Sequence, residues 1–429
     1  MSSEKQLRKW APLAGFAIVC LLTSALEAQT PLGPAFLVNP ESAGAQDNPD
    51  LQFDGAGRLW FVWEDNIGLE PQFDRVIARA LSPKGELGPA LVLVDTSDAP
   101  LTPVFEPLIA PMHEPAGGWT LFYSRYDADG FERVYGQPVS PSGELIGERF
   151  EASPPPPASA DCKTVSSLPN GGFFLLEYLI PCADCTSSPV SFDGLVLTGD
   201  GSPATPYFRV QRNRGKIPLP GVRSLAVDRH GNAIVVWGGV DDTDLRDSSD
   251  IRGRRFSPAG EPIGQEFLVN TTTRGTQSGP SVAADDEGNF VVVWQNRFPG
   301  GLLRSIFAQR FSKTGKKVGP EFRVNEDRVE KDFVPVVAMD HDGNFVVVWQ
   351  SFSLTRPQCV QVRARLYQRD GTPAGPEFPV APGDAACGEA PKVAFGPNGI
   401  FAVVWEVEQG FSPDTGTDFD VYAARFSAK

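Results

Sequence analysis

Gly288-Asn289-Phe290-Val291-Val292-Val293-Trp294 is the stretch that decides the fold, because it returns as Gly343-Asn344-Phe345-Val346-Val347-Val348-Trp349. Weaker copies recur along the 429-residue chain, and their terminal aromatic residues are spaced 55 to 60 residues apart. The aligned aromatic residues are Trp63, Tyr123, Tyr178, Trp237, Trp294, Trp349 and Trp405. A fixed period of this length indicates one supersecondary unit that must stack on its neighbours to bury its apolar face.

Each repeat unit is predicted to contain four short strands. In the fifth unit these are Ser281–Ala284, Phe290–Gln295, Ile306–Ser312 and Glu321–Asn325, separated by turns rich in Gly and Asp. The second strand is continuously apolar, which indicates that both of its faces are buried. No long stretch of the chain has the spacing of an amphipathic helix.

The two ends of the chain complement each other. The last unit stops after its third strand, Val421–Ser427, whereas Gly33–Asn39 near the N-terminus is a near copy of the fourth strand at Gly319–Asn325. Radial stacking of four-stranded units also explains a strand with two buried faces. We therefore predict an all-β fold, a seven-bladed β-propeller of four-stranded antiparallel blades, closed by the N-terminal strand completing the last blade. Six or eight blades are the alternatives.

The predicted organisation is a signal peptide at 1–28 followed by a single propeller domain at 29–429. A basic start (Lys5, Arg8, Lys9) precedes an apolar run up to Leu26, as in an export signal, with cleavage expected after Ala28 or Ala25. An uncleaved N-terminal anchor is the alternative. The predicted blades lie near 48–94, 103–150, 163–210, 222–270, 279–325, 334–380, and 390–427 plus 33–39. The expected location is secreted, periplasmic or at the cell surface.

The charge of the chain restricts its partners. The formal net charge is −15 and the pI about 4.8, which argues against nucleic acid and anionic membranes because both require concentrated Lys and Arg. No segment after the signal is apolar enough to span a bilayer. We expect a monomer.

The long connections are expected to gather on one face of the propeller. They include 64–74, 238–250, 351–361 and 406–420, whereas the remaining turns are short. Variable loops on a rigid scaffold are where binding usually occurs, although drift in unconstrained loops explains such variation equally well. The candidate binding residues on this face are Glu64, Asp65, Arg125, Asp241, Asp242, Arg297, Gln350 and Glu406.

Catalytic chemistry is not assigned from the sequence. His230 and His341 fall in short turns and His113 near an equivalent turn, so no Ser-His-Asp arrangement or histidine metal site is expected on the loop face. Carboxylates there, such as Glu64 and Glu406, resemble the parts of a glycosidase pair, but acidic residues are abundant throughout. A sialidase would also need clustered arginines to hold the carboxylate of its substrate, and no motif brings three arginines together.

The cysteines fall into two groups that the propeller places on the long-loop face. Cys359 with Cys387, and Cys162 with Cys182 or Cys185, are candidate disulfides in an exported protein. The Cys182-x-x-Cys185 spacing also allows a redox or zinc site, but a second cysteine pair and a nearby histidine are missing.

Two acidic loops are candidate calcium sites, one at 127–130 and one that contains Asp241, Asp242 and Asp244. Asp241, Asp242 and Asp244 supply hard oxygens for calcium, although the terminal Glu of a complete calcium loop is absent. A solvated acidic loop is the alternative, and no other metal or cofactor is expected.

The combination Glu-Phe-x-Val-Asn, Pro-x-Val-Ala, Asp-x-x-Gly-Asn-Phe-Val-Val-Val-Trp-Gln and Ala-x-Arg-Phe resembles a repeat of exported, uncharacterised bacterial proteins. The resemblance is strong from Val222 to Phe426 and moderate in the N-terminal strand and first unit. It implies a propeller outside the cytoplasm but no reaction. The leading functional hypothesis is a binding scaffold that presents the long-loop face to a glycan, peptide or protein. The alternatives are a polysaccharide-active glycoside hydrolase that uses loop-face carboxylates and a purely structural surface module.

Overall fold

The structure is a computed structural model. It describes residues 29–40, 45–66, 74–95, 104–112, 117–155, 158–180, 191–211, 223–240, 249–298, 304–326, 331–352, 359–381, 387–412 and 416–428. The predicted signal peptide (1–28) lies outside these residues, as do His113, Cys182, Cys185, Asp241, Asp242 and Asp244. Within the described residues the chain is all-β, with one short 3₁₀ turn, η2 (Pro397–Gly399). The prediction of an all-β protein is confirmed.

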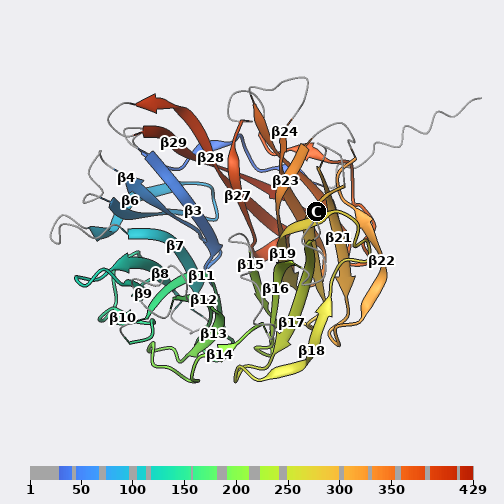
Figure 1. Cartoon of the computed structure of the whole chain (residues 1–429). Coiled ribbons are helices and arrows are strands. Elements are labelled where there is room, and N and C mark those ends of the chain that lie inside the picture. Colours follow the sequence, from blue (N-terminus) through green and yellow to red (C-terminus); the bar gives the residue numbers. More distant parts are fainter. Residues whose placement is uncertain are drawn as a thin grey trace, which may run out of the picture.

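The described strands form five sheets, which lie side by side around a common centre (Figure 1). The innermost strands of the units are β3 (Ala45–Phe53), β7 (Val104–Pro111), β11 (Ser159–Ser167), β15 (Arg223–Val227), β19 (Thr276–Ala284), β23 (Lys331–Met339) and β27 (Glu389–Phe395). The second strands are β4 (Leu59–Asn66), β8 (Trp119–Tyr126), β12 (Phe173–Ile180), β16 (Ala233–Val240), β20 (Phe290–Arg297), β24 (Phe345–Phe352) and β28 (Ile400–Ser412). The third strands are β5 (Asp74–Leu81), β9 (Glu132–Val139), β13 (Ser191–Leu197), β17 (Ser249–Phe256), β21 (Arg304–Phe311), β25 (Val360–Tyr367) and β29 (Gly416–Ser427). The outer strands are β6 (Leu87–Asp95), β10 (Phe150–Glu151), β14 (Phe208–Arg209), β18 (Pro262–Leu268), β22 (Lys317–Arg323) and β26 (Phe378–Pro379), with β1 (Thr30–Pro31) and β2 (Phe36–Leu37) at the N-terminus.

Neighbouring units meet at boundaries that we call seams. Each innermost strand contacts the innermost strand of the next unit, and β27 contacts β3. Single parallel bridges, Ser249 to Thr276 and Arg304 to Lys331, join three units into one twelve-stranded sheet. At the ends of the chain, β1 and β2 both pair with β29 in an antiparallel arrangement.

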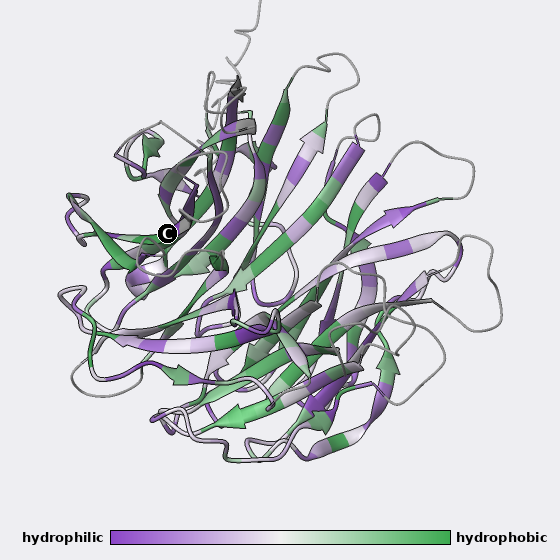
Figure 2. Ribbon diagram, turned by 60° about the vertical axis from the view of Figure 1, so that its left-hand side comes forward, coloured by the Kyte–Doolittle hydropathy of each residue, from purple (hydrophilic) through white to green (hydrophobic). Residues whose placement is uncertain are grey.

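The core lies between the units, which explains the apolar second strands. One cluster of buried side chains combines Val291 and Val293 of β20 with Val347 and Trp349 of β24. All residues from Phe290 to Trp294 are at most 2% exposed, so both faces of the strand are covered. Figure 2 shows hydrophobic segments along many of the strands, with hydrophilic segments between them.

The Asp-x-x-Gly-Asn segments are turns closed by their aspartate. Asp285 Oδ1 accepts hydrogen bonds from the backbone N–H groups of Glu287 (3.0 Å) and Asn289 (2.8 Å), and its Oδ2 accepts one from Asn289 Nδ2 (2.9 Å). Asp228 and Asp340 repeat these contacts. His230 and His341 lie in these turns, as predicted.

The Asn of the Glu-Phe-x-Val-Asn phrase ties the outer strand to the third strand. Asn270 Oδ1 accepts from the Ile251 N–H (2.8 Å), and its Nδ2 donates to Asp250 Oδ1 (2.7 Å). The N-terminal Asn39 makes the same pair of contacts with Val421 N–H (2.9 Å) and Asp420 Oδ1 (2.8 Å) of the last unit. We call this arrangement the asparagine bridge.

The innermost strands extend further than the sequence predicted. In the fifth unit the predicted strand Ser281–Ala284 is β19, which begins at Thr276 and has a register shift between Ser278 and Ser281. The residue before each proline there has positive φ: Asn48 (50°), Glu106 (49°), Gly279 (62°), Val334 (48°) and Ala390 (47°). The predicted strand began after Pro280, whereas β19 continues through the proline because the bulge places this residue, which has no N–H donor, outside the hydrogen-bonded ladder.

Candidate functional site: the loop face

The loop face is the end of the units where the second strands finish and the third strands begin. Asn66, Arg297 and Phe352 are last residues of second strands there, and Asp74, Arg304 and Val360 are first residues of third strands. The opposite end, the turn face, carries the Asp-x-x-Gly-Asn turns. The described candidate binding residues all belong to second strands.

Glu64 and Glu406 join neighbouring units. Each follows the buried Trp of its strand, and each accepts a hydrogen bond from the positive-φ residue of the next innermost strand. Asn48 N–H donates to Glu406 Oε1 (2.8 Å), and Glu106 N–H donates to Glu64 Oε1. Gln295 occupies the same position in the fifth unit and accepts from Val334 N–H (3.3 Å). This position therefore has a structural role that a neutral amide also performs.

The carboxylates at this position form a buried acidic group with Asp47. Glu64 and Glu406 are 6% and 8% exposed, and Asn48 Nδ2 donates to Glu64 Oε1 (3.0 Å). Burial raises the pKa of Glu406 to about 7, with a further contribution from the charge of Asp47. Burial also raises the pKa of Asp47, although a hydrogen bond with Glu64 opposes the rise. The group can hold a proton at neutral pH, as a general acid must.

The other described candidates, apart from Arg297, have different surroundings. Asp65 is 6% exposed, accepts from Gln46 Nε2 (2.6 Å) and pairs with Arg75. Gln350 is 3% exposed in the middle of the sixth unit. Arg125 is half-buried near the end of β8, beside Val104 and Arg133 in the register. Four of the predicted binding residues thus have buried side chains: Glu64, Asp65, Gln350 and Glu406. The reason is that the first two positions after the buried Trp still lie inside the sheet.

Arg297 lies in a loop-face cavity that the sequence did not predict. The cavity has a volume of about 320 Å³, lies at the seam between the fifth and sixth units, and is lined by Arg297, Arg304, Lys331, Phe333 and Phe352. Its residues come from β20 and β21 of the fifth unit and from β23 and β24 of the sixth. Their proximity therefore follows from the stacking of the two units. No motif in the sequence places three cationic side chains together, yet the fold does so here.

Two predicted sites lie outside the described residues. One is the calcium site of Asp241, Asp242 and Asp244, and the other is the cysteine pair Cys182 and Cys185. In the described part of the chain, no cluster of three or more His, Cys, Asp or Glu side chains could hold a metal ion.

The disulfide predictions have different outcomes. Cys359 and Cys387 form a disulfide at the seam between the sixth and seventh units, as predicted. Cys162, in contrast, is a free thiol, so its predicted disulfide with Cys182 or Cys185 is wrong. The reason is its place in the innermost strand β11, where its side chain is 2% exposed and burial raises its pKa well above the usual value.

Removal of the Cys359–Cys387 disulfide is expected to lower the free energy of unfolding by about 3 kcal/mol, because it closes a loop spanning 28 residues. Urea unfolding of the Cys359→Ser/Cys387→Ser variant measures this loss. Wild-type protein treated with a reductant is the control and should show the same decrease. Equal stability of oxidised and reduced protein would contradict the expectation.

Glu177 is a buried acid at the position that the alignment of the repeat units assigned to Tyr178. The Trp of β4, β16, β20 and β24 is the fifth residue of its strand, and in β12 the fifth residue is Glu177, not Tyr178. The alignment through Tyr178 is therefore wrong by one residue. Aligning the strand through Phe173, which follows the glycine turn as Phe290 does, gives the observed register.

The surroundings of Glu177 keep it protonated. Its side chain is fully buried, and burial raises its pKa to about 8. The Tyr207 hydroxyl oxygen lies 2.8 Å from Glu177 Oε2 and 2.9 Å from the Ala152 carbonyl oxygen. The hydrogen bond that Tyr207 donates to Glu177 lowers the pKa of the carboxyl, but the effect of burial is larger and decides the direction of the shift.

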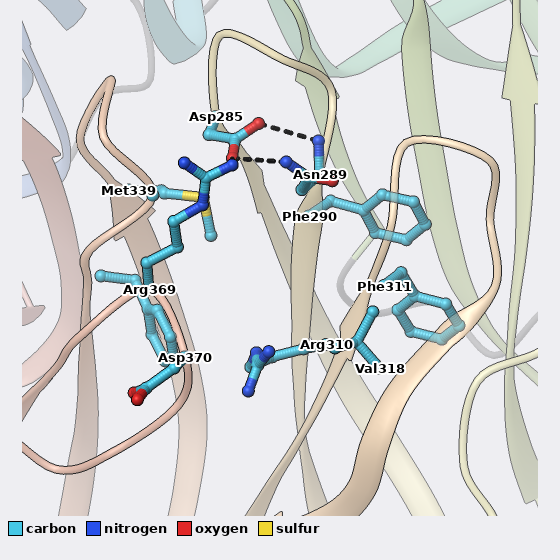
Figure 3. Close-up of a pocket in the computed structure, with 11 residues that line it drawn as sticks. Asp285, Asn289, Phe290, Arg310, Phe311, Val318, Met339, Arg369 and Asp370 are labelled. Atoms are coloured by element: carbon cyan, nitrogen blue, oxygen red, sulfur yellow. Dashed lines mark hydrogen bonds and ion pairs between the residues drawn. The ribbon is translucent and has the colours of Figure 1, made fainter.

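A second cavity, of about 360 Å³, lies on the turn face between the fifth and sixth units (Figure 3). Arg310 and Arg369 both line it, but Arg369 pairs with Glu287 (2.9 Å) and Arg310 lies against Gly371. Arg425 lies against Gly85 in the same way at another seam. This recurrence identifies an arginine–glycine packing contact between units.

Comparisons with known proteins address the fold. No protein-family model and no curated protein matches the sequence. Puromycin hydrolase is similar in structure (TM-score 0.54, 13% identity), over 91% of this chain and 55% of that one. The β-propeller domain of the Trilobed protease from Pyrococcus furiosus gives a TM-score of 0.50 at 8% identity, over 90% of this chain and 94% of that chain. The fold is a β-propeller.

A third similar structure is the α-L-arabinanase of Penicillium chrysogenum in complex with arabinobiose. Its TM-score is 0.51 at 14% identity, over 80% of this chain and 99% of that chain. Similarity at this level of identity concerns the fold alone. Among the described residues there is no helix long and apolar enough to cross a membrane.

Proposed function

We propose that this β-propeller is an exported binding scaffold that presents its loop face to a glycan. The observation that carries the proposal is the cavity of about 320 Å³ at the seam of the fifth and sixth units, which combines aromatic and charged side chains. Ligand sites in proteins typically combine apolar walls with a few polar groups that fix orientation. A second loop-face cavity, of about 500 Å³ beside the Cys359–Cys387 disulfide, lies at the next seam. A peptide or protein partner is the alternative for the same face.

A polysaccharide and glycan panel tests the proposal with the purified mature protein, residues 29–429, in calcium and in a chelator. Binding and release of reducing ends are measured together. Binding without release is the expected result, and its loss on chelation would implicate calcium at Asp241, Asp242 and Asp244. Absence of binding to every glycan would contradict the proposal and favour a protein partner or the purely structural role.

A polysaccharide-active hydrolase is the second candidate, supported by the buried group of Asp47, Glu64 and Glu406. Glu406, with its pKa raised to about 7, would serve as the proton donor and an ionised neighbour as the base or nucleophile. If the protein hydrolyses a glycan, its rate should fall as the pH rises above about 7, because Glu406 loses its proton. Glu406→Gln should then abolish turnover while leaving ligand affinity unchanged. If the variant keeps its turnover, Glu406 is not the acid.

We further propose that seven blades form a ring closed by the N-terminal strand. The contact of β27 with β3 and the pairing of β2 with β29 support this arrangement. The asparagine bridge of Asn39 to Asp420 and Val421, equivalent to that of Asn270, also supports it. The alternative is a propeller that the N-terminal strand does not close; the similar β-propeller domain of the Trilobed protease has an open velcro topology.

Export and a monomeric state are part of the same proposal. The Cys359–Cys387 disulfide supports an oxidising location such as the periplasm or the exterior. The test is fractionation of the producing cells, followed by N-terminal sequencing and a sedimentation measurement of the mature protein. A mature N-terminus at Gln29 and a monomeric mass are the expected results.

A further inference from the structure

We infer that the loop-face cavity between the fifth and sixth units binds the carboxylate of an acidic sugar residue. This inference rests on the proposed glycan-binding function and assigns the ligand class to one cavity. We call the cavity lined by Arg297, Arg304, Lys331, Phe333 and Phe352 the cationic pocket.

The strand register brings the three cations together. Arg297 at the end of β20 is directly opposite Arg304 at the start of β21, and Arg304 in turn forms the parallel bridge to Lys331 of β23. The two phenylalanines lie beneath two of the cations: the Arg304 guanidinium is 5.9 Å from the ring centre of Phe333, and Lys331 Nζ is 5.6 Å from that of Phe352. The cations and rings therefore form a continuous lining.

Within the described residues, no carboxylate neutralises the positive charge of the pocket. Arg297, Arg304 and Lys331 form no ion pair with any carboxylate in the described part of the chain. Asp332, the neighbour of Lys331, is 1% exposed and accepts from Asn325 Nδ2 and Trp349 Nε1 instead. Like charges directly opposite each other in a sheet are destabilising, so this arrangement costs stability that an anionic ligand would recover.

The repeat itself does not require these charges. At the seam between the fourth and fifth units the same parallel bridge joins Ser249 to Thr276, where the next seam has Arg304 and Lys331. Ser249 Oγ donates to the Gln277 carbonyl oxygen (2.7 Å), so uncharged residues satisfy this position. The cationic pocket is thus a local feature of one seam, in a chain whose net charge is −15.

The chemistry of the pocket selects the ligand. Guanidinium groups form paired hydrogen bonds with carboxylates, and aromatic faces give apolar contact area to a flat ring. A densely charged polyanion would be repelled by the acidic remainder of the protein, whereas a single carboxylate on an otherwise neutral glycan would not. A hexuronate residue within or at the end of a neutral chain meets these conditions.

The test uses a glucuronic-acid-bearing xylo-oligosaccharide and the same oligosaccharide after chemical reduction of its carboxyl group. Affinities are measured by titration calorimetry with the full mature protein at low and high salt. We expect the acidic oligosaccharide to bind at least about tenfold more tightly than its reduced form, because hydrogen bonds to charged groups exceed neutral ones. The difference should diminish as salt screens the charges.

The matched variant is Arg304→Ser/Lys331→Thr, which gives this seam the residues of the preceding one. It should fold as that seam does and lose the preference for the acidic form. Arg297→Gln, at an exposed position, is a second variant with the same expected direction. Arg274→Gln, outside the pocket, is the control and should retain the preference.

The outcomes separate this inference from the proposed function. Equal binding of the acidic and reduced oligosaccharides, or a preference that survives in both folded variants, would overturn the cationic pocket but leave glycan binding in place. Absence of binding to both oligosaccharides, together with a glycan panel that is entirely negative, would overturn both. If the protein binds only neutral glycans of the panel, with no preference for acidic ones, the assignment of an acidic sugar as the ligand would be wrong but glycan binding would stand.

Discussion

The Glu177→Gln variant is expected to be more stable than the wild-type protein at pH 8 by up to about 5 kcal/mol. The carboxyl is fully buried, and burial raises its pKa from the ordinary 4.5 to about 8. At 1.36 kcal/mol per pKa unit, this difference sets the largest free energy that ionisation can remove from the folded state. Glutamine keeps the size of the side chain, cannot ionise, and retains a carbonyl oxygen that accepts the hydrogen bond from Tyr207.

The sign of the pH dependence follows from proton binding. Between pH 4.5 and about 8 the folded protein keeps the Glu177 proton while the unfolded chain has released it. The free energy of unfolding therefore decreases as the pH rises through this window and levels off above it. Below pH 4.5 both the folded and the unfolded protein carry the Glu177 proton, so ionisation of Glu177 removes nothing from the free energy of unfolding there.

Urea unfolding at a series of pH values from about 5 to about 9 measures the effect. The wild-type midpoint should decrease with pH more steeply than that of Glu177→Gln, and the two should converge at the acidic end. Glu261→Gln, at an exposed turn position, is the control and should follow the wild type. Parallel pH profiles for the wild type and Glu177→Gln would show that Glu177 is ionised in the folded protein or accessible to water.

Glu177 also shows where the sequence argument fails. The period of the repeat predicts how many strands each unit has, and the glycine turns show where most of them begin. Both signals are local patterns in the sequence. The alignment failed in the third unit because it relied on an aromatic residue that this unit has replaced by an acid. Tyr207, brought from 30 residues away, supplies the partner that makes the replacement tolerable.

The candidate site could be predicted only in part. Arg297 was named because it follows a second strand, but Arg304 and Lys331 belong to other strands and to another unit. Their proximity depends on the register across a seam, which no single repeat encodes. Glu64 and Glu406 were predicted as binding residues of the loop face, but their side chains are buried. The bulge residues Asn48 and Glu106, whose backbone N–H groups donate hydrogen bonds to them, could not be foreseen from a residue-proline pair.

The Asn39→Ala variant is expected to lose about 2 to 5 kcal/mol of unfolding free energy. Asn39 is 1% exposed, and its removal leaves the Val421 N–H and the buried Asp420 without the hydrogen bonds that Asn39 provides. A buried group deprived of its partner costs about 1–3 kcal/mol, and more when it is charged.

The matched control is Asn270→Ala, which removes the same bridge within the fourth unit. There the bridge joins residues only 20 apart, in one continuous stretch of chain. Similar losses in both variants, measured by urea unfolding at one pH, are expected if the N-terminal strand is as firmly attached to the last unit as an outer strand is elsewhere. Hydrogen exchange at the Val421 amide should also become faster in Asn39→Ala.

The comparison of the two variants tests closure of the ring. If the N-terminal strand were only loosely associated with β29, Asn39→Ala would behave as a surface substitution and change stability by less than about 0.5 kcal/mol, while Asn270→Ala would still be destabilising. In a closed ring, by contrast, the N-terminal strand covers an edge that β29 would otherwise expose. Loss of Asn39 should then promote aggregation through that edge, whereas loss of Asn270 should not, because β18 stays attached to β17 through the chain itself.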